Sequence, residues 1–148
     1  MKPIDLQNYL HKNIPISVAL GVEVKDATCS RVVLSAPIEL NINHKGTVFG
    51  GSLHSLATLS CWGLVFMNLA DYPLPTEIVI ANSEIKYLTP VKNNFTVECS
   101  TIDKHDWIQF KEVLDEKGKS RIKLNANIYQ GGDLAIDYQG VFVAISKK

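Results

Sequence analysis

The chain has 148 residues, of which 46% are hydrophobic and 20% charged, a composition that fits one folded domain over residues 1–148 and excludes a disordered chain. Its 15 basic residues balance 15 acidic ones, so the charge favours neither nucleic acid nor an anionic membrane as a partner. Three widely spaced cysteines fit neither a disulfide framework nor a zinc site. The first residues lack the apolar run of a signal peptide, and we expect a soluble, cytoplasmic protein.

The first third of the chain is predicted to hold a helix and a β-hairpin. Apolar residues recur at helical spacing at Ile4, Leu6 and Leu10, and Pro37 closes the second of two strand-like runs. The predicted elements are a short amphipathic helix, one further helical turn, two strands and a polar loop, at residues 4–10, 16–20, 22–27, 31–36 and 39–45, respectively.

The longest uncharged stretch of the chain covers residues 46–70. It begins as a glycine-punctuated loop and continues as an apolar helix, which we expect to start near Gly51 or Ser52. Two prolines within residues 72–75 (YPLP) forbid its continuation. Polar side chains in its first half argue against a transmembrane segment. A helix that is apolar on nearly all sides must instead be wrapped by the rest of the protein.

The remainder of the chain predicts strands and one inserted helix. The helix, at residues 105–119, has Trp107, Phe110 and Leu114 at helical spacing; Asp106 can cap its start and Gly118 can end it. We expect it to lie on the edge of the sheet, and a strand with period-two alternation is the alternative. The predicted strands, the last two of which are joined at a Gly-Gly turn, cover residues 76–91, 94–102, 121–129 and 134–145.

This order of elements predicts an α+β fold rather than alternating βαβ units. An antiparallel sheet of about six strands can curl around the one long central helix and bury it. The helices at the amino terminus and in the insert are short by comparison. No internal repeat or low-complexity segment divides the chain.

The junction between the glycine-rich loop and the central helix is the first candidate site. Gly46, Gly50 and Gly51 allow close backbone approach, and the free N–H groups of a first helical turn attract negative charge. Two such groups can hold the oxyanion of an acyl-transfer reaction or a phosphate. Alternatively, the glycines only make a tight turn. Walker, dinucleotide-binding and Gly-x-Ser-x-Gly patterns are all absent from the sequence.

Two histidines lie near this junction. His44, in the loop, is the better general-base candidate because it precedes the expected oxyanion site, although a solvated loop histidine is an equal alternative. His54 lies one turn into the helix, where a partly buried, hydrogen-bonded histidine is the favoured interpretation. Cys61 lies in the most apolar part of the helix and is expected to be an inert buried thiol.

Two motifs carry a resemblance to a known family. Residues 43–53 (NHKGTVFGGSL) and residues 85–91 (IKYLTPV) resemble the hotdog-fold acyl-CoA thioesterases. The chain is most similar to a thioesterase family that is also found fused behind acetyltransferase domains, in which a pair like Trp62-Gly63 occurs. The resemblance implies a long central helix wrapped by an antiparallel sheet, and protomers that pair their sheets edge to edge into a homodimer or a dimer of dimers.

The sequence departs from one well-understood branch of that fold. Many phenylacetyl-CoA-type thioesterases carry the pattern N-x-x-G-x-x-H-G-G, followed by an acidic residue on the central helix. Phe49 stands at the position of the histidine and Thr58 at the position of the acid. The carboxylate mechanism of those enzymes therefore cannot be transferred to this chain.

The resemblance implies hydrolysis of an acyl-CoA or acyl-carrier-protein thioester, with acyl-CoA as substrate and no metal or other cofactor. The Gly51 N–H would polarise the carbonyl and Asn43 would orient the attacking water. His44 or Thr58 would fill the missing role, assisted by Ser83 or Glu84 across the dimer. The residues expected to bind substrate are Gly46, Phe49, Gly50, Ser52, Ser83 and Tyr87.

Two other functions remain open on this evidence from sequence. One is an acyl-CoA or acyl-chain binding module without catalysis, which the missing carboxylate suggests. The other is dehydration of a hydroxyacyl thioester, although no acid stands on the helix beside a loop histidine. Neither nucleic acid nor a membrane is expected as a partner.

Overall fold

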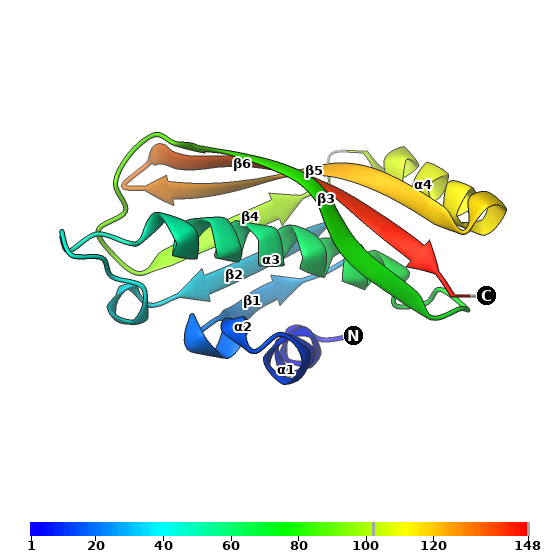
Figure 1. The fold of residues 1–148 in the computed structure, drawn as a ribbon, viewed down its shortest axis with the longest axis horizontal. Helices are drawn as coiled ribbons and strands as arrows, with labels where there is room; N and C mark the ends of the chain where they lie inside the picture. The colour runs from blue at the N-terminus through cyan, green and yellow to red at the C-terminus, as the bar shows by residue number, and fades with distance from the viewer. Residues whose placement is uncertain (102, 148) are drawn as a thin grey trace.

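The computed structural model describes residues 1–101 and 103–147 and shows a six-stranded antiparallel sheet curled around one long helix, α3 (Figure 1). The strand order is β1-β2-β4-β5-β6-β3, so the predicted α+β arrangement of six strands around a central helix is confirmed. The helices are α1 (Pro3–Asn13), α2 (Ile16–Ala19), the 3-10 helix η1 (Ile38–Leu40), α3 (Gly50–Leu69) and α4 (Lys104–Lys117). The strands are β1 (Glu23–Ala27), β2 (Arg31–Ala36), β3 (Thr76–Tyr87), β4 (Phe95–Ser100), β5 (Lys119–Gln130) and β6 (Asp133–Ser146).

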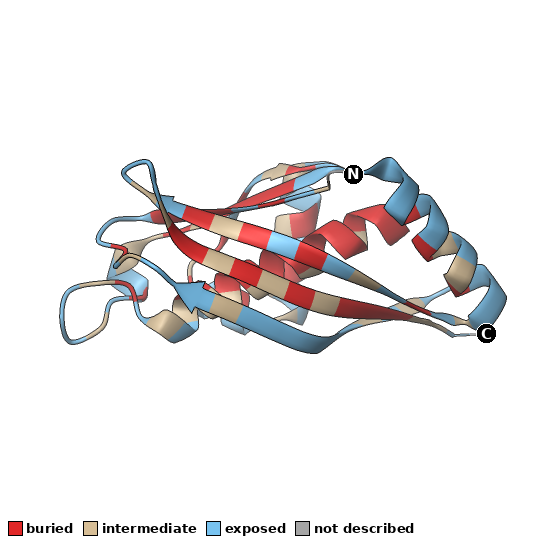
Figure 2. Ribbon diagram, turned by 90° about the horizontal axis from the view of Figure 1, so that it is seen from above, coloured by how far each residue is buried: buried red, intermediate tan, exposed pale blue. Residues whose placement is uncertain are grey.

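Helix α3 begins slightly earlier than predicted. Phe49 is extended and its carbonyl oxygen accepts the N–H groups of Ser52 and Leu53, so the first helical residue is Gly50 rather than Gly51 or Ser52. No side chain caps this end. Most of the helix is buried, as its red colour in Figure 2 shows. Within the described residues, no helix is both long and apolar enough to cross a membrane.

One side of α3 is not completely covered. The residues along this side recur at intervals of three and four, which places them on one face of the helix. We call them the open stripe: Gly51, Ser55, Thr58, Trp62 and Phe66. Gly51 is exposed and the other members are half-buried, whereas the helical residues on the opposite side are buried.

The two edges of the sheet differ in how they are covered. At one edge, α1 packs on β1 and buries Leu6 and Leu10 against the core. At the other edge, β3 pairs with β6 alone and is mostly exposed, seen in Figure 2 as a pale blue ribbon. Its backbone N–H and C=O groups on the far side have no neighbouring strand in the described part of the chain. This edge is therefore open to a further strand.

Three predicted elements need correction. The strand at residues 76–91 ends at Tyr87, because the pairing becomes irregular where Leu88 and Thr89 both donate to the Ala135 carbonyl before Pro90. The loop at residues 39–45 begins within η1. The strand at residues 94–102 is β4, and Ile102 lies outside the described residues.

The inserted helix is confirmed, with two corrections. Asp103, not Asp106, caps α4 by accepting the His105 N–H, while Gly118 ends the helix as predicted, at a φ of 72°. The helix buries Trp107, Phe110 and Leu114 against β5. Because β5 lies between β4 and β6, α4 packs on an interior strand and not on the edge of the sheet.

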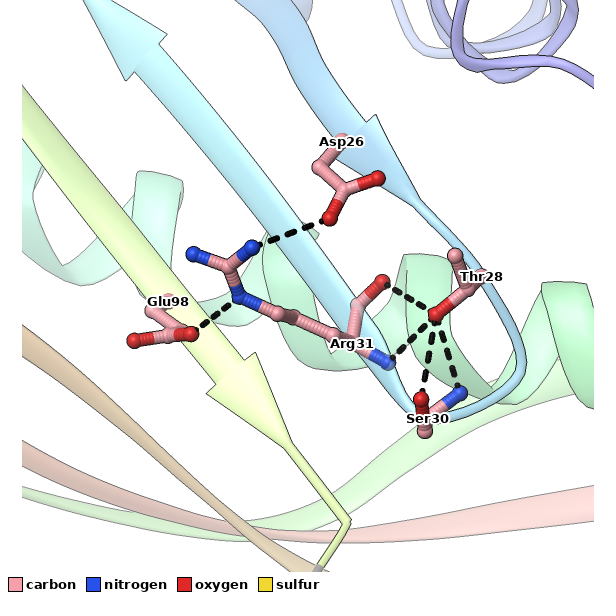
Figure 3. A network of polar contacts seen from close by, with 5 residues as sticks. All are labelled: Asp26, Thr28, Ser30, Arg31 and Glu98. Atoms are coloured by element: carbon pink, nitrogen blue, oxygen red, sulfur yellow. Dashed lines mark hydrogen bonds and ion pairs between the residues drawn. The ribbon is translucent and has the colours of Figure 1, made fainter.

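A polar network holds the β1–β2 hairpin to β4 (Figure 3). The Arg31 guanidinium pairs with Glu98 on β4 and, at 3.0 Å, with Asp26 on β1. The Thr28 hydroxyl accepts the Ser30 and Arg31 N–H groups and closes the hairpin turn. All these side chains are exposed, so we assign the network to strand alignment and expect little stability from each ion pair.

Candidate active site

The loop before α3 is organised by the side chain of Asn43. Its Oδ1 accepts the N–H groups of Lys45 and Thr47 at 2.9 and 3.2 Å, and its Nδ2 donates to the Thr47 hydroxyl at 2.8 Å. Gly46 completes the turn with a φ of 81°, a conformation that L side chains rarely adopt. Both lone pairs of Oδ1 are thereby used, so the second hydrogen of Nδ2 is the group that remains for a water molecule.

The first turn of α3 presents two free amides. The N–H groups of Gly50 and Gly51 have no acceptor within the described residues, whereas those of Ser52 and Leu53 are bound to Phe49. Free amides and the positive end of the helix dipole attract an anionic oxygen. The predicted oxyanion site therefore has the required donors.

Two aromatic rings flank these amides. A Cβ on Gly51 would lie 2.6 Å from Cε2 of Phe49, so the phenyl ring sits directly over the Gly51 Cα. On the other side, the Tyr87 hydroxyl donates to the Gly50 carbonyl oxygen at 3.1 Å, which ties the start of α3 to the end of β3. A Cβ on Gly50 would lie 3.4 Å from Cε1 of Tyr87, so a side chain on either glycine would meet an aromatic ring.

His54 lies on the β3 side of the helix, one turn after Gly51. Its Nε2 is 3.2 Å from the hydroxyl oxygen of Ser83 on β3, and its ring packs edge-on against Tyr138 on β6. The predicted half-buried, hydrogen-bonded histidine is what the structure shows. Helical side chains lean towards the amino end of their helix, so the imidazole leans towards the glycine amides. Its Nδ1 has no hydrogen-bond partner in the described part of the chain.

Thr58 stands at the position where the sequence pattern of phenylacetyl-CoA-type thioesterases has an acid. Its hydroxyl donates to the His54 carbonyl oxygen at 2.9 Å and is also 2.9 Å from the Tyr138 hydroxyl. Burial raises the pKa of Tyr138 to about 12, which keeps the phenol neutral. The site therefore holds a neutral Thr–Tyr pair in place of a carboxylate.

The structure brings together most of the predicted site residues and separates one from them. His44 stands exposed on the loop, and its ring has no hydrogen-bond partner in the described residues. Ser83 contacts His54 of its own chain, whereas the sequence led us to expect it to act across a dimer. Ser83 and Tyr87 contact the first turns of α3 from β3. The other predicted residues, on α3 or in the loop before it, are Asn43, Gly46, Phe49, Gly50, Gly51, Ser52 and Thr58, and His54 lies beside them.

Tyr138 is the residue that sequence reasoning missed. It lies in a strand where its alternation with Ile136 and Phe142 predicts only a core position. Helical spacing places His54 and Thr58 on the same side of the helix as Gly51. This spacing is the one feature of the sequence that indicates a position for His54 near the glycine amides. Within the described residues, no three His, Cys, Asp or Glu side chains are grouped to hold a metal.

Comparison with known proteins identifies the family. A family model described as "Putative thioesterase (yiiD_Cterm)" matches residues 4–146. The fold is similar to that of a protein with unknown function from Chlorobaculum tepidum TLS, with 28% identity over 98% of this chain and 94% of that chain and a TM-score of 0.93.

Two further solved structures share the fold. A putative thioesterase from Shewanella oneidensis is 27% identical, covers 97% of this chain and 96% of its own, and has a TM-score of 0.84. A probable thioesterase from Pseudomonas aeruginosa, 21% identical, shares the fold with a TM-score of 0.80 over 98% of this chain and 97% of its own. The resemblance seen in the sequence is confirmed: this chain has the hotdog fold and belongs to that putative thioesterase family.

Proposed function

We propose that this protein hydrolyses the thioester of an acyl-CoA or acyl-carrier protein at the amino end of α3. The observation that carries the proposal is the pair of free glycine amides with His54 one turn away on the same side of the helix. An oxyanion needs fixed donors, and attack by water needs a base within reach. Both groups are here at one junction.

The proposed reaction has two parts. The carbonyl oxygen of the thioester accepts the Gly50 and Gly51 N–H groups, which stabilise the negative charge that forms on it. Nδ1 of His54 takes a proton from water as the water oxygen bonds to the carbonyl carbon. The C–S bond then breaks, and the imidazolium returns the proton to the leaving thiolate. The products are a carboxylic acid and a free thiol.

His54 fits the role of base better than the two residues proposed from the sequence. His44 is exposed on the loop, and the Thr58 hydroxyl already donates to the His54 carbonyl oxygen. A hydroxyl is in any case a poor base near neutral pH. The proposed role requires the tautomer in which His54 Nε2 donates to the Ser83 hydroxyl oxygen and Nδ1 carries the lone pair, and the 3.2 Å contact is compatible with it.

The experiment for this proposal is release of free thiol from a panel of acyl-CoAs, followed with a disulfide-exchange colour reagent. We expect turnover with at least one acyl chain and its loss in His54→Gln. If neither acyl-CoAs nor acyl-carrier-protein thioesters released thiol, the hydrolase proposal would fail.

The second candidate is an acyl-binding module without catalysis. The neutral pair of Thr58 and Tyr138, where related enzymes keep an acid, favours it. A binding module predicts saturable affinity for an acyl-CoA together with no thiol release. Calorimetric titration of the purified protein beside the colour assay separates the two functions.

We also propose that two chains pair through β3 into a homodimer. The support is the open edge of β3 and its exposed Val79 and Ile80, which are 44% and 41% exposed. An unpaired, apolar edge strand is a template for another strand. Pairing at this edge would bring the partner's β3 close to Ser83 and Glu84, beside the proposed catalytic group.

A further inference from the structure

A cavity of about 520 Å³ opens beside the carboxyl half of α3. Its walls come from α1, α3 and β3, and Figure 1 shows α1 and β3 beside the carboxyl half of α3. Tyr9, Trp62 and Phe66 form a stacked aromatic group within it: the ring centroids of Tyr9 and Phe66 are 4.5 Å apart and those of Trp62 and Phe66 are 5.3 Å apart. The cavity volume lies in the range of small-molecule sites.

Two polar groups at this cavity are already paired within the chain. The Trp62 indole N–H donates to the Ile78 carbonyl oxygen at 3.2 Å, which leaves the ring faces for apolar contacts. Glu77, the charged residue of the lining, pairs with Lys147 at 2.8 Å. The aromatic group therefore offers apolar ring surface, and the carboxylate of Glu77 is paired.

The open stripe runs along one face of α3 from Gly51 to Trp62 and Phe66, which line this cavity. Along it the side chains change from small and polar, at Ser55 and Thr58, to large and aromatic, at Trp62 and Phe66. The stretch from Gly46 to Ala70 carries no charged side chain. Since the Thr58 hydroxyl is bound to the His54 carbonyl oxygen and to Tyr138, the helix presents no unpaired hydroxyl at this point of the stripe.

We propose that the open stripe binds the acyl chain of a long-chain thioester, with the end of the chain in the aromatic cavity. This inference rests on the proposed function, because it places the thioester carbonyl at the Gly51 amide. It assigns the substrate class of the same site: saturated chains long enough to reach Trp62. Shorter chains stop at Thr58 and leave the cavity empty.

Helix geometry sets the required length. At a rise of about 1.5 Å per residue, Trp62 lies about 16 Å and Phe66 about 22 Å beyond Gly51 along the axis. A fully extended chain advances by about 1.2 Å per bond, as a polypeptide does at roughly 3.5 Å per residue of three bonds. A chain of about 14 carbons therefore reaches Trp62, whereas an octanoyl chain ends about halfway.

The direct test uses the fluorescence of Trp62. The sequence holds two tryptophans, and the other, Trp107, is a buried residue of α4. A long-chain fatty acid brominated near its terminal methyl is titrated into the wild type and into Trp62→Phe, since bromine quenches only an indole in contact with it. We expect saturable quenching of about half the emission in the wild type and none in Trp62→Phe. Equal quenching in both proteins, or none in either, overturns the proposal.

A kinetic test compares chain lengths in the active protein. We expect Phe66→Ala to lower kcat/KM for palmitoyl-CoA by about tenfold, because the chain loses the contacts of a few methylenes, and for octanoyl-CoA by less than about twofold. Tyr129→Ala, which removes an exposed ring on β5 away from the stripe, is the matched control and should change neither value. A loss that is equal for both substrates overturns the assignment.

The two proposals fail in different ways. Quenching of Trp62 without thiol release leaves the acyl site standing and removes the hydrolase. Thiol release with no preference for long chains, and no quenching, leaves the hydrolase standing and removes the acyl site.

Discussion

Nε2 of His54 lies 3.2 Å from the Ser83 hydroxyl oxygen, and this contact joins the amino half of α3 to β3. It holds the imidazole against β3, and Nδ1 has no hydrogen-bond partner within the described residues. A histidine held in this way is oriented by its neighbour, as the base of many hydrolytic sites is.

The first prediction concerns this histidine. His54→Gln keeps a side chain that can still contact Ser83 but removes the base, so kcat should fall by about 10²–10⁴-fold with little change in KM. Steady-state thiol release measures both constants. Ser83→Ala should lose less, because it removes only the orienting contact.

A matched control separates a base from a general effect of losing a histidine. His105 is exposed on α4, away from the site, and His105→Gln should retain wild-type kinetics. Wild-type rates in His54→Gln together with a large loss in His44→Gln would instead assign the base to the loop histidine.

The second prediction concerns Gly51 and the phenyl ring above it. Gly51→Val places side-chain atoms where Cε2 of Phe49 now lies, so the ring must swing away and the amide is shielded from substrate. We expect turnover to be abolished while the protein stays folded, because the Phe49 ring is exposed and can move into solvent.

Thermal unfolding recorded beside thiol release distinguishes blocked chemistry from lost structure. The double variant Phe49→Ala/Gly51→Ala tests the cause, since it removes the ring that a Cβ would meet. If this double variant turns over substrate, the displaced Phe49 ring causes the loss of turnover in Gly51→Val. If the double variant is inactive, the side chain at position 51 blocks the amide by itself. Unchanged turnover in Gly51→Val would remove the oxyanion assignment.

The third prediction concerns stability at alkaline pH. Burial raises the pKa of Tyr138 to about 12 from an ordinary value of 10.0. Between these values the native state holds more protons than the unfolded chain, so the contribution is complete below about pH 10 and is lost as the pH rises towards about 12. Between about pH 10 and pH 12, the wild type should therefore lose about 2 kcal/mol more of its free energy of unfolding than Tyr138→Phe does.

Urea unfolding at both ends of that pH window measures the difference. The phenylalanine keeps the ring in the core, so packing is nearly the same in the two proteins. Parallel loss of stability in both would show that the phenol is not protected in the native state.

The fourth prediction concerns the open edge of the sheet. Ile80→Lys places a charge on an apolar, unpaired strand, which disfavours pairing with a second copy. We expect light scattering after gel filtration to give the mass of a dimer for the wild type and of a monomer for the variant. Tyr129→Lys, on β5, should leave the mass unchanged, and a wild-type monomer would exclude pairing through β3.

Much of the fold could be predicted from residue patterns alone. The uncharged stretch around α3 can exist in water only if other elements cover it, and the period-two runs after it supply a sheet to do so. The end of α3 and the end of α4 were also predictable, because prolines and Gly118 constrain the backbone locally. The edge position expected for α4 was wrong, since strand order is not encoded locally.

The sequence by itself therefore determined the wrapped helix, the glycine amides at its start and the missing acid at Thr58. Only the tertiary structure decided what surrounds them: Ser83 and Tyr138 come from strands far along the chain and meet His54 and Thr58 across the core. Motifs record contacts between neighbours in sequence, whereas strand pairing and helix packing create contacts between distant residues. For that reason the sequence favours the loop histidine, which is close in sequence to the glycines, whereas the contact between His54 and Ser83 is seen only in the folded chain.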